Sequence, residues 1–291
     1  MERPSLSLVV VAFNMERELP RTLLSLSPPL QKGLGGLDYE VVLVDNGSDR
    51  PIVAPGGRTR VIRLDDAPSS PARAVNLGLD AARGQLVGVM VDGARIASPG
   101  MVRHAALAWR LHPRPVIATL GFHLGPDVQM RSVHQGYDQA REDTLLESVG
   151  WQEDPYRLFR ISAFAASSAG GWFAPLAESN ALFMTRQMWS ELGGYDERFR
   201  SPGGGLVNLD TYARACDLPD SQVIVLLGEA TFHQVHGGVA TNALVSPGEG
   251  FHAEYREIRG RQFRTPDPDR IYLGRLPADV MPSIRRSVTG A

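Results

Sequence analysis

Buried apolar runs alternate with amphipathic stretches through the first hundred residues. Nearly continuous apolar runs rich in β-branched residues are typical of strands that are buried on both faces of a parallel sheet. Between these runs, apolar residues such as Leu19 and Leu23 recur at roughly helical spacing. The pattern predicts strands at 6–13, 39–44, 60–64 and 86–91 and helices at 16–26 and 72–82.

The alternation of strands and helices predicts an α/β fold, in which helices flank an open, mostly parallel sheet. The segment 135–160 is mixed and acidic, as expected of helices that cover a sheet. Residues 241–291 are rich in Gly, Pro and Arg and lack strong periodicity, which predicts an extended arm or lid with a helical patch at 254–259. Further strands are predicted at 116–122, 179–185 and 222–227, and further helices at 99–111 and 186–192.

Polar residues gather where the predicted strands end. Asn14 follows the first strand, the run Asp-Asn-Gly-Ser at 45–48 follows the second, and Asp92 follows the fourth. Because ligands in such sheets bind beyond the carboxyl ends of the strands, we expect a ligand site there. The alternative is that these residues only form turns and cap helices.

Two common nucleotide-binding motifs are missing from the chain. A dinucleotide site needs Gly-x-Gly-x-x-Gly after the first strand, where segment 12–16 reads Ala-Phe-Asn-Met-Glu. There is no Walker A loop, and the glycines at 203–205 follow no predicted strand. We therefore expect neither a Rossmann dinucleotide site nor a P-loop.

The polar groups at the strand ends give the chain a specific resemblance. Over residues 5–240 it resembles inverting family 2 glycosyltransferases with the GT-A fold, whose first strand ends in an aromatic residue and Asn and whose second ends in Asp-Asp-Gly-Ser or Asp-Asn-Gly-Ser. The resemblance implies transfer of a sugar from a UDP- or GDP-linked donor to an acceptor hydroxyl, with inversion. A carboxylate at Asp45 can accept a hydrogen bond from the N–H edge of uracil or guanine. The donor-site residues implied are Phe13, Asn14, Asp45, Asn46, Gly47, Arg73, Asn76, Asp92 and Gly93.

The family's metal-binding motif is only partly present. Family members end the fourth strand in Asp-x-Asp, whose last carboxylate binds Mn²⁺ or Mg²⁺, but here the triplet is Asp92-Gly93-Ala94. Either Asp92 holds the metal with help from elsewhere, or a cation such as Arg95 or Arg73 replaces it. The resemblance offers His233 and His236 as additional metal ligands. On a strand these two histidines would face opposite sides, so at most one is expected at the site unless the backbone turns between them.

The acceptor half of the resemblance lies at 178–184 and 193–199. The family's catalytic base is the Asp of a Glu-Asp pair, and strict register places Asn208 there. Asn cannot accept a proton, so Asp210 is the first candidate base and Glu178 the second. Asp210 would otherwise cap a helix at 211–215. Three aromatic residues are predicted to line the sugar site or to pack in the core: Trp151, Trp172 and Phe173.

Composition and charge narrow the class of protein. The chain has 291 residues, is 43% hydrophobic and has a net charge of −2, which favours a globular protein and argues against nucleic acid as partner. The single cysteine, Cys216, cannot form an internal disulfide, and the apolar run at 6–13 is too short to span a bilayer. We therefore expect a soluble cytoplasmic protein with at most peripheral membrane contact.

The predicted organisation is a GT-A-like catalytic domain at 1–240 followed by an arm at 241–291. A nucleotide-binding half covers 1–121 and an acceptor half covers 122–240. The arm carries four arginines that would close over the donor diphosphate or form a solvated basic helix: Arg256, Arg259, Arg261 and Arg264.

The expected partners are a nucleotide-sugar donor and a saccharide, lipid-linked or small-molecule acceptor, and a homodimer stays open. Two other functions also stay open. Ala94 and Asn208, which stand where carboxylates are expected, are consistent with a catalytically inactive nucleotide-sugar-binding or regulatory protein. A nucleotidyltransferase is disfavoured because no basic Gly-rich loop follows the first strand.

Overall fold

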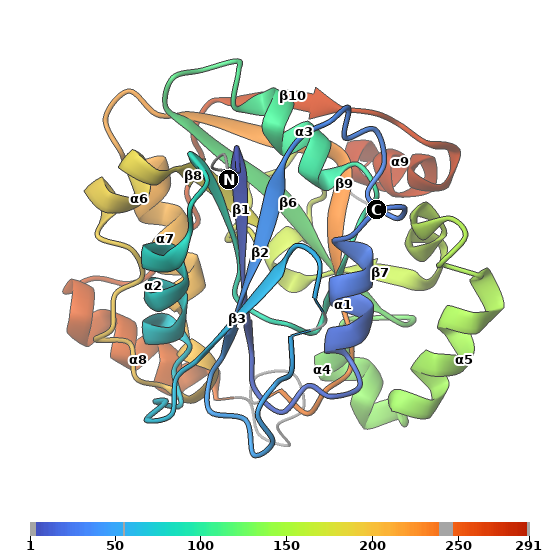
Figure 1. The fold of residues 1–291 in the computed structure, drawn as a ribbon, viewed down its shortest axis with the longest axis horizontal. Coiled ribbons are helices and arrows are strands. Elements are labelled where there is room, and N and C mark those ends of the chain that lie inside the picture. Colours follow the sequence, from blue (N-terminus) through green and yellow to red (C-terminus); the bar gives the residue numbers. More distant parts are fainter. Residues whose placement is uncertain (1–3, 55, 239–246, 290–291) are drawn as a thin grey trace.

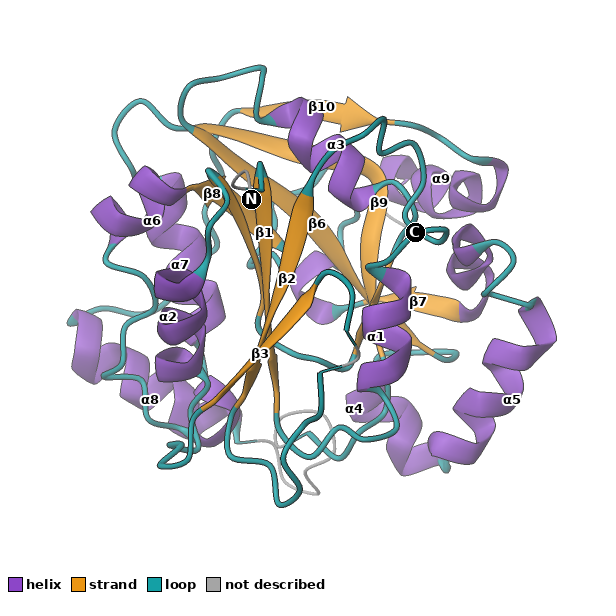
Figure 2. Cartoon of the chain, in the orientation of Figure 1, coloured by secondary structure: helices purple, strands orange, loops and turns teal. Residues whose placement is uncertain are grey.

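A ten-stranded sheet forms the centre of the molecule, with helices on both faces (Figures 1 and 2). This computed structural model describes residues 4–54, 56–238 and 247–289. The strand order is β10-β9-β6-β8-β4-β1-β2-β3, with β5 paired to β9 and β7 paired to β6. The strands are β1 (Leu6–Ala12), β2 (Tyr39–Asp45), β3 (Thr59–Arg63), β4 (Leu86–Met90), β5 (Arg95–Ala97), β6 (Pro115–Leu124), β7 (Ser162–Phe164), β8 (Leu182–Thr185), β9 (Gln222–His233) and β10 (Arg270–Gly274).

The helices pack against both faces of this sheet. A separate cluster of buried hydrophobic side chains lies between the sheet and the helices on each face. One cluster joins the sheet to α1 and α3, and the other joins it to α2, α6, α7 and α8. None of the helices within the described residues combines the length and apolarity needed to cross a bilayer. The helices are α1 (Leu19–Ser25), α2 (Ala72–Ala81), α3 (Met101–Ala108), α4 (Gln129–Ser132), α5 (Gln139–Val149), α6 (Arg186–Leu192), α7 (Val207–Cys216), α8 (Gly248–Arg259) and α9 (Met281–Thr289).

The strand directions bring distant parts of the sequence to one edge of the sheet. β1 is parallel to β2 and β4, whereas β8 is antiparallel to both β4 and β6. β6 and β9 run parallel to each other, so two reversals across β8 leave them pointing the same way as β4. The carboxyl ends of β1, β2, β4 and β9 therefore lie at a common edge, which is where a ligand site is expected in such sheets.

The predicted α/β sheet is confirmed, and the largest difference concerns the length of β9. The strand was expected at 222–227 but continues to His233. Residues 228–233 do not continue the apolar pattern of the first part of the strand. The backbone is irregular here: Gly228 has a φ of 79°, and the pairing with β6 shifts register between Ala118 and Leu120. An irregularity of this kind interrupts the periodicity by which a strand is predicted.

The C-terminal segment differs from the expected extended arm. Over the described residues 247–289, α8 packs beside α7, β10 pairs in parallel with β9, and α9 follows. β10 thus extends the main sheet, although only its pairing with β9, and not its own short sequence, indicates this. The beginning of the predicted arm lies outside the described residues, and the domain boundary at 240 stays a prediction.

Gly88 of β4 pairs with Phe183 of the antiparallel strand β8, near the centre of the sheet, where only glycine leaves room for the Phe183 ring. A Cβ added there would lie 2.4 Å from the ring of Phe183 on β8. We predict that Gly88→Ala lowers the free energy of unfolding by about 1–3 kcal/mol, because Phe183 must leave its packing position. Urea denaturation measures the change. Gly250→Ala on α8, where an added Cβ meets nothing within 4 Å, is the matched control, and equal stability of the two variants would contradict the prediction.

Candidate functional site

The turn after β1 is held against the turn after β2. Asn14 adopts a φ of 51°, a left-handed conformation that Asn tolerates. Its backbone N–H donates to the Ser48 hydroxyl at 3.0 Å, and its side chain exchanges two hydrogen bonds with Asp49. The neighbouring Phe13 is half exposed. Asn14 therefore fixes the loop that leaves Phe13 open at the sheet edge.

Asp45, predicted to read the donor base, ends β2 and is fully buried. Its Oδ1 accepts from the Ser48 backbone N–H at 2.9 Å. Its Oδ2 accepts from the Ile52 N–H at 3.1 Å and from Arg63 at 2.7 Å. Burial alone would raise the pKa of Asp45, but these hydrogen bonds outweigh it and lower the pKa. The carboxylate is ionised and rigid, and its contact with a base stays a prediction.

Three further predicted donor-site residues, Asn46, Gly47 and Gly93, lie in the turns that follow β2 and β4. Asn46 is buried with an unpartnered Oδ1, and Gly47 has a φ of 80° that a side chain would strain. Gly93 lies so close to β1 that a Cβ would be 3.0 Å from the Val11 carbonyl oxygen. These three residues shape the turns around the site rather than contribute charge.

Among the described residues, the two predicted residues on α2, Arg73 and Asn76, form no hydrogen bond or ion pair with Asn14, Asp45 or Asp92. Asn76 bonds the backbone N–H and C=O of Tyr195 and the Glu197 carboxylate, so it ties α2 to the turn after α6. Arg73 is exposed on the same helix. Whether Arg73 meets a ligand stays a prediction.

A compact group of three side chains lies beyond the ends of β4 and β9. The Asp92 Oδ2 lies 2.7 Å from the His233 Nε2 and 3.6 Å from the His236 Nε2. The two Nε2 atoms are 3.1 Å apart. β9 ends at His233, and the backbone turns before His236, so both histidines face the site. The backbone turn that two histidines three residues apart need in order to face one site is therefore present.

The protonation of this group follows from burial and mutual charge. Burial disfavours ionisation of Asp92, yet the charges of His236 and His233 hold its pKa well below the usual range. Burial lowers the pKa of His233 to about 4, which Asp92 only partly offsets. Burial also opposes charge on His236, but the nearby Asp92 raises its pKa. At neutral pH the site holds a carboxylate and a neutral His233.

Gln129, which sequence reasoning missed, orients the imidazole of His233. Its side-chain amide donates to the His233 carbonyl at 3.0 Å, so its Oε1 faces the His233 Nδ1 at 2.6 Å. A neutral His233 then carries its proton on Nδ1, and the Nε2 lone pair points at the Asp92 carboxylate. Two electron-rich atoms at this distance require a proton or a cation between them.

Within the described residues, the donor set at this edge suits a divalent cation. The ligand atoms of Asp92, His233 and His236 all lie within 4.8 Å of one another. Two imidazoles and one carboxylate fit a transition ion such as Mn²⁺ better than Ca²⁺, which prefers oxygen ligands. The residues present therefore fit the metal that the family uses, although Ala94 offers no ligand where the family has a second carboxylate.

Asp210, the first candidate base, lies in α7 and is engaged by two arginines. Arg259 of α8 donates to both of its oxygens at 2.6 Å, and Arg214 donates at 2.8 Å. Asp210 is 1% exposed. Its N-cap role is not seen, because α7 begins earlier at Val207. Arg259, one of the four arginines of the predicted lid, therefore joins α8 to α7 through its contact with Asp210.

Glu178, the second candidate base, is half-buried just before β8. Asn208 donates to its Oε2 at 2.6 Å, and Asn180 lies 3.4 Å from its Oε1. Tyr195 in turn donates to the Asn208 Oδ1 at 2.9 Å. The asparagine that stands in the family's base position thus holds a glutamate that comes from a different element.

Two of the three predicted sugar-platform aromatics are core residues. Trp172 is fully buried, and its indole N–H donates to the Leu226 carbonyl at 3.0 Å. Trp151 is 5% exposed. Phe173 is exposed but packs edge-on against Tyr272 of β10. The aromatic residues therefore stabilise the fold rather than line an open sugar site.

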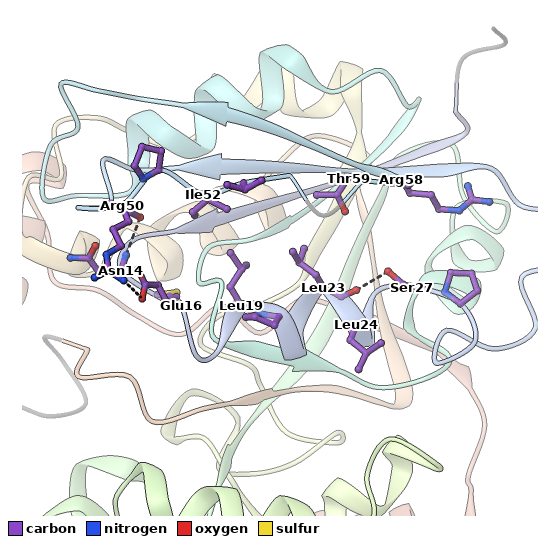
Figure 3. Close-up of a pocket in the computed structure, with 18 residues that line it drawn as sticks. Asn14, Glu16, Leu19, Leu23, Leu24, Ser27, Arg50, Ile52, Arg58 and Thr59 are labelled. Atoms are coloured by element: carbon purple, nitrogen blue, oxygen red, sulfur yellow. Dashed lines mark hydrogen bonds and ion pairs between the residues drawn. The ribbon is translucent and has the colours of Figure 1, made fainter.

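A cavity of about 670 Å³ lies between α1 and residues 50–53 and 56–59. Figure 3 shows Leu19 and Leu23 pointing from α1 toward Ile52, with Asn14 and Arg50 at one end. Neither Asp92 nor the two histidines line this cavity. It is an apolar groove beside the polar site and not part of it.

Glu142 of α5, also missed from the sequence, braces the loop that carries His236. Its Oε2 accepts from the Val235 backbone N–H at 2.9 Å, and its Oε1 pairs with Arg17 at 3.3 Å. Arg17 also pairs with Asp143 at 2.6 Å and donates to the Val235 carbonyl. The only sequence signal was the acidic character of 135–160, which does not say which carboxylate is buried.

Glu142 generates a pH-dependence of stability. Burial raises its pKa to about 7 from 4.5, so the folded protein holds a proton that the unfolded chain releases. The stability it contributes is therefore greatest below about pH 4.5 and is lost as pH rises through about 7.

We predict that the free energy of unfolding, taken relative to Glu142→Gln, falls by roughly 3 kcal/mol between these two pH values. Urea denaturation of both proteins across this range measures the difference. A constant or rising difference would show that Glu142 is ionised in the folded state throughout.

Comparisons with known proteins agree with this fold. Residues 1–349 of S. aureus TarS match with a TM-score of 0.52 and 15% identity, covering 87% of this chain and 64% of that chain. The same fragment in complex with UDP-GlcNAc matches with a TM-score of 0.53 and 16% identity, covering 87% and 65%. The chain thus spans less than two thirds of these structures, and at such identities the likeness shows the fold. The comparison with curated proteins finds no match.

The sequence itself matches the family described as "Glycosyl transferase family 2" over residues 7–165. The match covers more than half of the 291 residues and includes the strand ends that carry Asn14, Asp45 and Asp92. Its sheet has the GT-A arrangement, mostly parallel with β8 inserted in the opposite direction. The chain therefore belongs to glycosyl transferase family 2 and has a GT-A-like fold.

Proposed function

We propose that the chain transfers a sugar from a UDP-linked donor to an acceptor hydroxyl with inversion at the anomeric carbon. The observation that carries the proposal is the convergence of Asp92, His233 and His236 at the strand ends of a family 2 fold. UDP is favoured over GDP because the structural relative TarS has been captured with UDP-GlcNAc. The acceptor stays within the class of saccharides, lipid-linked compounds or small molecules.

On the donor side, placed groups would hold an anionic nucleotide without a basic surface. Asp45 would accept the N–H of the base, and Phe13 is exposed beside it at the sheet edge. Asp92, His233 and His236 would hold Mn²⁺ or Mg²⁺, which when bound supplies positive charge to the departing diphosphate. The net charge of −2 is compatible with this arrangement, because a few buried groups provide the binding.

On the acceptor side, Glu178 is favoured as the general base. It is half-buried, and Asn208 and Asn180 orient its carboxylate. In the reaction its oxygen takes the proton of the acceptor hydroxyl while that hydroxyl oxygen bonds to the anomeric carbon. The bond from that carbon to the diphosphate breaks, and UDP leaves with the electron pair. Asp210 is disfavoured because Arg214 and Arg259 occupy both of its oxygens.

The competing function is nucleotide-sugar binding without transfer. Asn208 and Ala94 favour it, because each replaces a carboxylate that the family uses. The geometry around Glu178 weakens this alternative, since Asn208 holds a second carboxylate rather than leaving the acceptor side without one. Turnover separates the two functions, because both predict that a nucleotide binds.

The first test is nucleotide binding. Isothermal titration with UDP and with GDP, each with and without Mn²⁺, should give UDP binding that tightens at least severalfold with Mn²⁺. GDP should bind more weakly than UDP. Absence of binding by both nucleotides would contradict the proposed function.

The second test separates the two candidate bases. Glu178→Gln should slow hydrolysis of UDP-GlcNAc by about 10²–10⁴-fold and leave UDP affinity within twofold, because only proton transfer is lost. Asp210→Asn is the comparison variant. It should lower the free energy of unfolding by about 3 kcal/mol, because it leaves Arg214 and Arg259 without their shared carboxylate.

The two variants also allow the opposite assignment. Asp210 is the base if Asp210→Asn keeps its stability and loses hydrolysis while Glu178→Gln retains it. If the unaltered chain binds UDP but neither hydrolyses nor transfers a sugar from any donor tried, the binding function replaces the transferase.

A further inference from the structure

Arg95 is a buried cation whose hydrogen-bonding capacity the fold does not use. It begins β5 and pairs with His233 of β9 in antiparallel register, so the two side chains lie on the same face. The residue is 9% exposed. Its Nε and Nη1 are both buried and have no hydrogen-bond partner among residues 4–54, 56–238 and 247–289. Few arginines of the described chain combine such burial with unused donors.

Burial without partners is unfavourable for a guanidinium. Desolvation lowers the pKa of Arg95, and the charges of Asp92 and Glu178 only partly restore it. Arg remains protonated in proteins, so the charge stays. The nearest acid is Asp92, whose Oδ2 lies 3.8 Å from the Arg95 Nε, which is too far for a hydrogen bond. The acids near Arg95 therefore balance part of its charge but leave its Nε and Nη1 without a hydrogen bond from the described residues.

The two nearby carboxylates are already committed to other partners. Asp92 faces His233 at 2.7 Å and accepts from the Ala94 backbone N–H at 2.9 Å. Glu178 accepts from Asn208. Arg95 thus lies between the donor-side cluster and the candidate base, with two N–H groups available for a ligand.

We propose that Arg95 binds the donor diphosphate through Nε and Nη1. These two nitrogens point in different directions, so each would donate a charge-assisted hydrogen bond to a different oxygen of the diphosphate. This inference deepens the proposed function and rests on it. It also gives a physical role to the difference at Ala94. The family has a metal-binding carboxylate at this position, whereas here the next residue, Arg95, supplies a fixed positive charge to the diphosphate.

The same placement couples the metal to the nucleotide. The guanidinium lies close to the Asp92 oxygen that would bind a divalent ion, so its charge repels that ion when no anion is present. A diphosphate between the two cations removes this repulsion. Mn²⁺ should therefore bind weakly to the free protein and tightly in the presence of UDP, and by linkage each strengthens the other.

The test compares Arg95→Met with the unaltered chain in two binding measurements. Isothermal titration should show at least a tenfold loss of UDP affinity, with uridine affinity unchanged, because uridine lacks phosphate. Mn²⁺ alone, followed by the electron paramagnetic resonance of the free ion, should bind severalfold more tightly to the variant. A structural defect would weaken both ligands, so opposite changes identify a charge effect.

Two further variants keep the result interpretable. Arg95→Lys retains the charge without the two separated donor nitrogens of the guanidinium, so its UDP affinity should fall between the other two. It replaces Arg95→Met if that variant does not fold. Arg60→Met removes an arginine of β3 that donates to Glu40 and to the Ala81 carbonyl, away from the site. It should change neither UDP nor Mn²⁺ binding.

The outcomes distinguish this inference from the proposed function. Equal UDP affinity in Arg95→Met and the unaltered chain, or equal losses for UDP and uridine, would overturn the role of Arg95 while leaving the transferase intact. Inorganic pyrophosphate serves as a second probe. If the unaltered chain binds pyrophosphate through Arg95 but binds neither UDP nor GDP, the anion site stands and the nucleotide-sugar donor falls.

Discussion

The contact between Asp92 and His233 joins the two parts of the sequence on which the site depends. Asp92 follows β4, one of the first strands, whereas His233 ends β9, more than a hundred residues later. Their side chains meet only because β8 is inserted in reverse between β4 and β6, which leaves β9 pointing in the same direction as β4. A neutral imidazole nitrogen and a carboxylate oxygen at 2.7 Å form a favourable pair only with a cation or a proton between them. The geometry of the sheet thus brings together two atoms that need a proton or a metal ion between them.

Buried polar networks on both sides keep His233 in place. Glu229 lies at the start of the final stretch of β9 and accepts hydrogen bonds from Ser98, the Gly100 backbone, His104 and Tyr156. These bonds tie the irregular part of β9 to β5 and α3. On the other side, Glu142 and Arg17 hold the backbone at Val235. Because buried polar groups are costly when unpaired, each network strongly favours one position of the strand end.

Local patterns predicted the first half of the molecule well, and the reason is physical. β1, β2 and β4 are buried on both faces, and their apolar runs identify them within a residue or two. The polar residues that follow these strands identified the edge that carries the site. The strands β1 to β4 of this half pair with one another in parallel register.

The other half depends on contacts between residues far apart, which no local pattern encodes. β10 has only five residues and is recognisable as a strand through its pairing with β9. The sequence placed Asp210 ahead of Glu178 as candidate base. Our proposal reverses that order because of two partners, Arg259 and Asn208, that approach from other elements. Arg95 was visible as a cation beside the altered metal motif, but its burial and its unused donors appear only in three dimensions.

The proposed donor-side and acceptor-side acids, Asp92 and Glu178, both interact with the charge of Arg95. Such proximity is what an inverting transfer needs, since the base and the departing diphosphate act on opposite sides of one carbon. The most direct test is a crystal structure of the chain with UDP and Mn²⁺. The account predicts the diphosphate within hydrogen-bond distance of Arg95, with the ion on Asp92, His233 and His236. A nucleotide seated instead in the apolar groove beside α1, with no ion at these three residues, would contradict it.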